Sequence, residues 1–207
     1  MDGRTGRQPG TREQLIIAAE RLFALQGIRE VSLREIGAAA GQRNTSAAQY
    51  HFGDKAALIE AIFDHRMSTI NERRMRHLAT MRVDGRGGEL RPLIEAFLVP
   101  LAESVTGPES YYARFLAQFS ADPRYRTSFD WETAESLRLV WRGFRRCLSH
   151  LPEPTVRARL RMLEHLVLHT IADHERAAEP GGGEHPGPWV AELADAAEGL
   201  LTAPVTG

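Results

Sequence analysis

The sequence has one cysteine and no long apolar run. Because Cys147 is alone, no intrachain disulfide can form, and its neighbours Phe144 and Leu148 predict a buried thiol in a helix rather than a nucleophile. No apolar stretch approaches the roughly 18 residues that a membrane span needs. Residues 1–10 are polar and rich in glycine, unlike the apolar centre of a signal peptide. We therefore expect a cytoplasmic protein with no membrane partner.

Strand patterns and catalytic motifs are also lacking. Alternating β-branched runs do not occur, whereas apolar residues recur every three or four positions, which predicts an all-α fold. Neither a Gly-x-Ser-x-Gly elbow nor a phosphate-cradling glycine loop is found, so the sequence gives little support for an enzyme. We expect no catalytic residues and no cofactor. The 207 residues, 43% of them hydrophobic, suffice for a small module and a helical body with its own core.

Lysine is nearly absent, since Lys55 is the one lysine among the 26 basic residues. The net charge of −1 hides an asymmetry along the chain. Residues 1–80 carry 12 basic and 9 acidic side chains, whereas residues 81–207 carry 14 basic and 18 acidic ones. The sign of this small excess favours an N-terminal part that faces phosphates, although it decides nothing by itself.

Four helices are expected in the N-terminal part. A capping box at residues 11–14 opens the first, and Gly27 ends it. A second capping box, from Ser32 to Glu35, opens a short helix that Gly41 closes in the left-handed conformation. A polar helix and a long fourth helix follow, the third at Thr45–His51 and the fourth after the capping residue Asp54.

The second and third helices form the pattern of a helix-turn-helix, in which a recognition helix enters the DNA major groove. Small or apolar inward residues would let the helices approach closely: Ile36, Ala39, Ala47, Ala48 and Phe52. The outward groups suit base edges and phosphates: Gln42, Arg43, Asn44, Thr45, Ser46 and Gln49. An ordinary helical hairpin shows the same pattern, so spacing alone leaves both interpretations open.

Taken together, these residues resemble the TetR family of bacterial transcriptional regulators. The resemblance covers roughly residues 11–60 and is carried by Leu22-Phe23, Gly27, Val31 to Ile36, Ala40-Gly41, Tyr50 to Lys55, and Leu58. It implies a three-helix DNA-binding domain at 11–58, with its helix-turn-helix at 32–51. A helical-bundle domain for effector binding and dimerisation would occupy 59–207.

The resemblance also implies roles for individual side chains. Ser32 and Arg34 would lie at the edge of the groove, and Tyr50, His51 and Lys55 would contact phosphates. Lys55 follows the helix cap at Asp54, where a helix N-terminus and an ammonium group together favour a phosphate.

The sequence departs from the family's pattern in two places. Gln49 stands where the family has a tyrosine, so an amide replaces one expected phosphate contact. One additional residue lies between Gly41 and Phe52, which lengthens the turn at Arg43 and Asn44. The register of the recognition helix is therefore open by one residue, and with it the choice of side chains that face the bases.

Helices are predicted for the body at 90–105, 109–121, 130–150, 155–178 and 188–201. Similar family members enclose an apolar effector pocket, and the aromatic residues at the centre of the body are candidates to line it: Tyr111, Tyr112, Phe115, Phe119, Trp131 and Trp141. Ordinary core packing is the alternative. Polar side chains available to orient an effector are Arg114, Gln118 and Arg138.

The last two helices carry further patterns. His165, His169 and Asp173 share one helical face, but no distant third ligand accompanies them, so we expect no metal site. Two apolar stripes exceed what a small body easily hides, which predicts a homodimer through these helices. The stripes are Val156, Leu160, Leu163, Val167 and Ile171, and then Trp189, Leu193, Ala197 and Leu200.

These expectations combine into one function. A dimer would occupy a pseudo-palindromic operator in double-stranded DNA and repress transcription until a small-molecule effector releases it. A DNA-organising or interaction protein that uses the same motif without an effector is the alternative. Repression and activation are not distinguished by the sequence.

Overall fold

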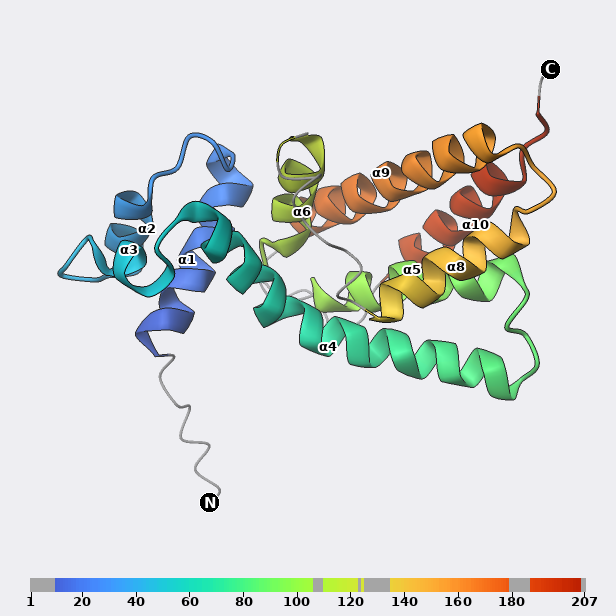
Figure 1. Cartoon of the computed structure of the whole chain (residues 1–207), viewed down its shortest axis with the longest axis horizontal. Helices are drawn as coiled ribbons and strands as arrows, with labels where there is room; N and C mark the ends of the chain where they lie inside the picture. The colour runs from blue at the N-terminus through green and yellow to red at the C-terminus, as the bar shows by residue number, and fades with distance from the viewer. Residues whose placement is uncertain (1–9, 106–109, 123, 125–134, 179–186, 206–207) are drawn as a thin grey trace. The chain divides into compact units, whose positions relative to one another are not determined.

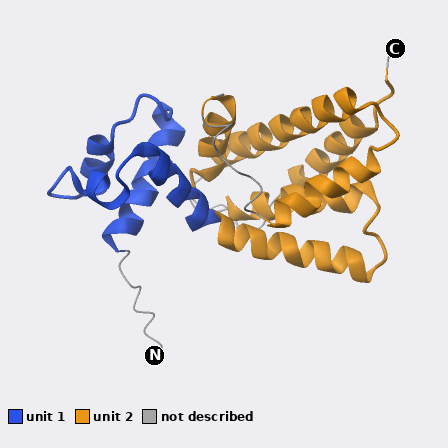
Figure 2. Cartoon of the chain, in the orientation of Figure 1, with its two compact units in different colours: residues 1–66 blue, residues 67–207 orange. Residues whose placement is uncertain are grey.

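The computed structural model describes residues 10–105, 110–122, 124, 135–178 and 187–205 (Figure 1). Within these ranges it contains helices joined by turns and no strand, which confirms the all-α fold. The chain divides into two compact units, residues 1–66 and 67–207 (Figure 2). The division falls within the long helix α4 (Lys55–Val83).

Unit 1 contains α1 (Thr11–Gln26), α2 (Leu33–Ala39), α3 (Ala47–Phe52) and the first part of α4. Helix α1 packs against both α2 and α3. Apolar side chains from all four helices form the core, and the largest contributors are Leu15, Phe23, Ile36, Leu58, Ile62 and Phe63. A buried ion pair ties α1 to α4, because Glu20 accepts hydrogen bonds from Nε and Nη2 of Arg66 at 2.7 and 2.6 Å.

Hydrogen bonds confirm two predicted helix caps. Ser32 Oγ accepts a hydrogen bond from the Glu35 amide at 3.2 Å, and the Ser32 amide donates to the Glu35 carboxylate at 2.6 Å. The Asp54 carboxylate accepts from the Ala57 amide at 2.8 Å in the first turn of α4. The box and the aspartate each satisfy amides that a helix N-terminus leaves without an intrahelical partner.

The capping box predicted at residues 11–14 is wrong. Gly10 is the N-cap of α1 and supplies no side-chain hydrogen bond, while Thr11 is already helical. The Gln14 side chain bonds elsewhere, because its Oε1 accepts from Gln42 Nε2 at 3.0 Å. A contact between segments distant in the sequence therefore uses the group that local spacing had assigned to a cap.

At Gly37, helix α2 lies close to the turn that precedes α3. A Cβ atom there would lie 2.7 Å from the backbone oxygen of Thr45, so only glycine fits without moving the backbone. The prediction that Ala39 faces inward is wrong, since Ala39 is exposed. Helix α3 begins at Ala47 rather than Thr45, after a turn in which Asn44 Oδ1 accepts from the Ser46 amide at 3.0 Å.

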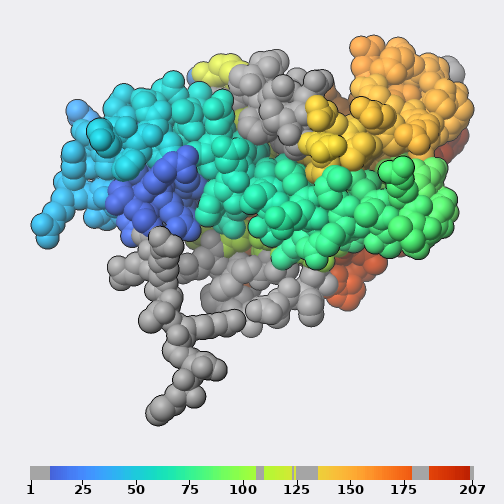
Figure 3. Space-filling view, turned by 60° about the horizontal axis from the view of Figure 1, so that its bottom comes forward, coloured from blue at the N-terminus to red at the C-terminus, as the bar shows by residue number. Residues whose placement is uncertain are grey.

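Unit 2 contains the rest of α4 and five further described helices: α5 (Leu90–Ser104), α6 (Tyr112–Ala121), α8 (Glu135–Cys147), α9 (Glu153–Ala177) and α10 (Trp189–Thr202). Helix α9 packs against α6 and α10, and α5 packs against α8 and α10 (Figure 1). Figure 3 shows α8 beside the later part of α4. Ser136 of α8 donates a hydrogen bond to Asn71 of α4 at 2.8 Å.

The apolar stripes of α9 and α10 are largely buried within the single chain. All five predicted α9 residues are at most 6% exposed, as are Leu193 and Ala197, while Trp189 and Leu200 are half-buried. The argument that these stripes need a second subunit is therefore wrong, because α6 and α10 already cover α9. Apolar exposure lies elsewhere on this part of the chain, at Met162 (55%) and Val205 (49%).

Candidate functional site

Most of the candidate DNA-binding residues lie in the turn before α3 or on α3 itself, while Ser32 and Arg34 lie at the start of α2 and Lys55 begins α4. Most of them are exposed: Ser32, Arg34, Arg43, Asn44, Thr45, Ser46, Gln49, Tyr50 and His51. Tyr50 is 86% exposed, an unusual position for a large aromatic side chain, and its ring makes an edge contact with His51. Gln42 and Lys55 are half-buried.

Several of the predicted base-reading amides already have partners inside unit 1. Gln42 donates to Gln14 at 3.0 Å, and Gln49 donates to the Gly53 carbonyl at 2.7 Å at the end of α3. Asn44 is engaged in the turn before α3. A contact from these amides to a base edge would have to replace or share a hydrogen bond, whereas Arg43 and Thr45 are exposed in the same turn.

Lys55 has a structural role that sequence spacing did not indicate. Its ammonium group donates to the carbonyls of Ile28 and Arg29, at 2.8 and 3.3 Å, in the turn that follows α1. Two hydrogen bonds from Ser32 hold the pKa of Glu35 below its usual value, and the Lys55 charge lowers it further. Lys55 therefore anchors the connection between α1 and α2 in addition to any contact with DNA.

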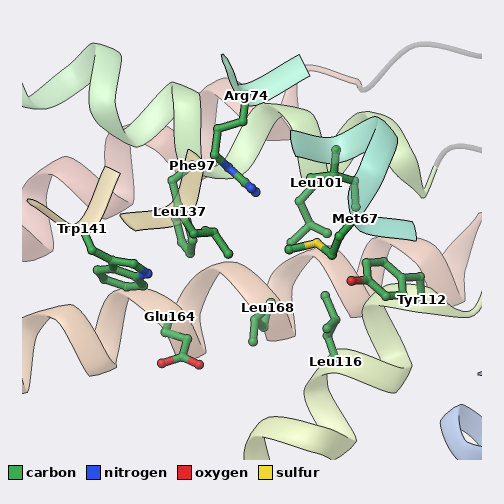
Figure 4. Close-up of a pocket in the computed structure, with 11 residues that line it drawn as sticks. Met67, Arg74, Phe97, Leu101, Tyr112, Leu116, Leu137, Trp141, Glu164 and Leu168 are labelled. Atoms are coloured by element: carbon green, nitrogen blue, oxygen red, sulfur yellow. The ribbon is translucent and has the colours of Figure 1, made fainter. Parts of the chain in front are cut away.

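Unit 2 contains a partly open cavity of about 160 Å³ between five helices (Figure 4). Most of the lining is apolar, and the side chains come from α4, α5, α6, α8 and α9: Met67, Ile70, Arg74, Phe97, Leu101, Tyr112, Leu116, Leu137, Trp141, Glu164 and Leu168. An apolar cavity with few polar groups is the usual form of a small-molecule site.

The aromatic candidates fall into different places. Tyr112 and Trp141 line the cavity. Phe115 and Phe119 are fully buried and pack against each other, with ring centroids 6.1 Å apart, and neither lines the cavity. Trp131 lies outside the described residues.

The polar side chains suggested as ligand-orienting groups do not line the cavity either. Gln118 and Arg138 are exposed. The Arg114 guanidinium lies over the ring of Tyr111 and pairs with the buried Glu175 carboxylate at 3.1 Å. Glu175 also accepts hydrogen bonds from the Ser110 hydroxyl and the Ala113 amide, so this carboxylate of α9 caps the start of α6.

Two charged residues of the cavity lining, Arg74 and Glu164, were not predicted from the sequence, and Arg74 is the more deeply buried. It is 2% exposed, and its Nη1 donates to Asn71 Oδ1 and Ser136 Oγ at 3.1 and 3.3 Å. Its Nε is buried without a hydrogen-bond partner. Burial lowers the pKa of Arg74 to about 10, which keeps the group charged at neutral pH. Its position on the apolar face shared by Met67 and Ile70 was a readable signal.

The histidines of α9, which could in principle bind a metal, have ordinary packing partners. His165 and His169 lie with ring centroids 6.1 Å apart, and His174 stacks on Trp189 at 4.0 Å. In the described part of the chain no three His, Cys, Asp or Glu side chains gather as a metal site would require. Cys147 is half-buried, and desolvation raises the pKa of its thiol. No described helix is long and apolar enough to span a bilayer.

Comparison with known families places both units. Residues 15–62 match the family described as bacterial regulatory proteins, tetR family, and residues 95–203 match the tetracyclin repressor-like C-terminal domain. A comparison with curated proteins gives no match. The first match contains the helix-turn-helix, and the second contains most of the helices around the cavity. The chain therefore belongs to the TetR family and is a DNA-binding transcriptional regulator.

Proposed function

We propose that the chain is a repressor that binds a pseudo-palindromic operator as a dimer and leaves it when a small apolar or amphipathic molecule occupies the cavity of unit 2. The cavity is the observation that carries this proposal. An apolar space of about 160 Å³ beside a buried charge favours a regulator that responds to an effector. Well-packed cores contain few voids of this size.

The expected size of the effector follows from the cavity volume. An apolar protein cavity of about 150 Å³ accepts one benzene molecule. The cavity of unit 2 is similar, so the effector is compact, or the surrounding helices separate to admit a larger one. Release requires tighter binding of the effector to the conformation that does not bind DNA, because equal affinity for both conformations shifts no population.

Dimerisation through α9 and α10 remains part of the proposal, but by a different face of these helices. Met162 of α9, Leu200 of α10 and Val205 line a shared surface groove, and Met162 is the most exposed of the three. A two-fold axis at this groove would place the same apolar groups against each other. Met162→Glu should reduce the sedimentation mass toward the 23.1 kDa of one chain, whereas Met75→Glu, at an exposed methionine of α4, should not.

The function is tested by selecting binding sites from random double-stranded DNA and then measuring release from the selected site. Thermal shift against a library of small apolar and amphipathic molecules identifies binders, and fluorescence anisotropy shows whether they weaken DNA binding. Trp141→Ala should abolish the response, while Trp189→Ala, outside the cavity, should preserve it. A selected site without two-fold symmetry would contradict the dimeric operator. Binders that leave DNA affinity unchanged would contradict release and favour a regulator without an effector.

The same selection tests which residues read bases. Arg43→Ala or Thr45→Ala should relax one operator position, mirrored in the second half-site, at a cost of about 1 to 3 kcal/mol per base contact. Gln42→Ala should have a smaller effect on sequence preference, because its amide is already bonded to Gln14. An unchanged preference in both exposed-residue variants would place the base contacts elsewhere on α3.

A further inference from the structure

The cavity of unit 2 contains a buried cation, Arg74, that has no counterion among the described residues. No described carboxylate forms an ion pair with Arg74, and its two hydrogen-bond acceptors, Asn71 and Ser136, are neutral. Both acceptors bind the same terminal nitrogen, Nη1, while Nε is buried without a partner. Figure 4 shows the guanidinium directed into the space between Leu137 and Leu101. The group is therefore held in place from one side only.

This arrangement is unfavourable for the folded chain alone. A buried charge without a partner loses its hydration and gains no ion pair in return. The contrast within unit 2 is with Glu175, a buried carboxylate that accepts hydrogen bonds from Ser110, Ala113 and Arg114. The same unit thus satisfies one buried charge completely and leaves the charge in the cavity incomplete. An anion that enters the cavity would complete it.

We propose that the effector is a compact amphipathic carboxylic acid, whose carboxylate pairs with Arg74 and whose apolar part fills the remaining space. This inference rests on the proposed function, since it specifies the ligand of the same cavity. A guanidinium is the preferred protein partner of a carboxylate, because its planar donors match the two oxygens. The apolar part would contact Phe97, Leu101 and Leu168, which form the uncharged lining.

The cavity lining contains a second charged residue, Glu164. This residue is half-buried, and its carboxylate points away from the Arg74 guanidinium (Figure 4). Glu164 also defines the competing possibility, a ligand with an amine that pairs with this residue instead of an acid that pairs with Arg74.

Calorimetric titration of the full chain with matched probes tests the inference. The acids are phenylacetate and hexanoate, and each is compared with the amide and the amine of the same carbon skeleton. We expect both acids to bind about tenfold or more tightly than their amides, as a charged hydrogen bond implies. Arg74→Met should remove this preference without loss of fold, because it replaces a buried charge with an apolar chain of similar length. Arg76→Met, at an exposed arginine of α4, should keep the preference.

Each outcome decides a different point. Equal affinity for acids and amides overturns the acidic effector while leaving a cavity that binds small molecules. Tighter binding of the amines overturns it in favour of Glu164. If no probe binds the wild-type chain, the compact acidic effector is rejected, and the thermal shift against the wider library decides separately whether the cavity binds a small molecule. An acid preference that survives in Arg74→Met also overturns the role of Arg74. Arg74→Lys keeps the charge, so it should retain part of the preference.

Discussion

The buried charge of unit 1 and the buried charge in the cavity of unit 2 have different surroundings. In unit 1 the Glu20 carboxylate is 3% exposed and takes two short hydrogen bonds from Arg66, so the charge is neutralised inside the fold. In the cavity of unit 2, Arg74 is equally buried but has neutral partners on one nitrogen only. A completed ion pair contributes to a fixed geometry, which a domain that reads DNA requires. An incomplete one leaves binding energy for a ligand.

Glycine packing shows the same difference. A Cβ at Gly37 would meet the Thr45 backbone at 2.7 Å, whereas a Cβ at Gly143 of α8 would meet the end of the Leu93 side chain at 2.6 Å. A leucine side chain can change rotamer, but a backbone carbonyl in a tight turn cannot move alone. Unit 1 therefore tolerates less change at its helix contact than unit 2.

The largest expected effect comes from breaking the ion pair of unit 1. Glu20→Ala would leave Arg66 without its buried partner and should lower the free energy of unfolding by about 3 kcal/mol, the lower end for buried pairs because Arg66 is a quarter exposed. Chemical denaturation of the full chain measures it, with Arg74→Met as the comparison. The contrast between the units is lost if Arg74→Met costs as much as Glu20→Ala.

The next effect is at the contact of α2 with the turn before α3. Gly37→Ala should cost roughly 1 to 3 kcal/mol, as overpacking does, and should weaken DNA binding because α3 must shift. Gly143→Ala should cost less, since Leu93 can adjust, and should leave DNA binding unchanged. Denaturation curves and anisotropy on one operator compare the two variants. Equal losses of stability in the two variants would show that the backbone at Thr45 moves as easily as the Leu93 side chain.

A smaller effect is expected at the capping box of α2. Ser32→Ala removes the cap and should cost about 1 kcal/mol. The folded pKa of Glu35 is below its ordinary value of 4.5, so its stabilisation is complete above that pH and is lost as the pH falls through the lower folded pKa. Ser32→Ala should therefore flatten the dependence of stability on pH below 4.5. Glu89→Ala, at the N-cap of α5, removes no capping hydrogen bond and only an exposed ion pair with Arg86, so it should alter this dependence less.

Local sequence patterns predicted the helices and most of their ends. The capping box from Ser32 to Glu35 and the aspartate at Asp54 were readable because each uses partners within three residues. The box at residues 11–14 failed because Gln14 has a partner 28 residues away. A cap with partners nearby in the sequence can be predicted from local spacing. A contact between distant segments cannot, because the periodicity of one helix does not show which other helix its face meets.

The cavity could be predicted only in part for the same reason. The aromatic residues at the centre of the body included two that line the cavity, Tyr112 and Trp141. Phe115 and Phe119 are aromatic as well, but they pack in the core instead. The apolar stripes of α9 looked unpartnered because the sequence does not reveal that α6 and α10 cover them. The sequence does place Arg74 on an apolar helical face. Whether such an arginine lines a cavity depends on the neighbouring helices, which the sequence pattern does not show.

The smallest expected effect concerns Lys55, which has a structural role and a proposed role in DNA binding. Its ammonium donates to the Ile28 and Arg29 carbonyls, and the family resemblance implies that it also contacts a phosphate. If Lys55 also neutralises a phosphate, Lys55→Met should weaken binding on all DNA sequences alike and reduce the slope of log affinity against log salt by about one per half-site. Lys55→Arg keeps the charge and should keep the slope. A lower melting temperature with an unchanged slope in Lys55→Met would show that Lys55 serves only the turn after α1, and that unit 1 uses this charge as it uses Glu20, for its own geometry.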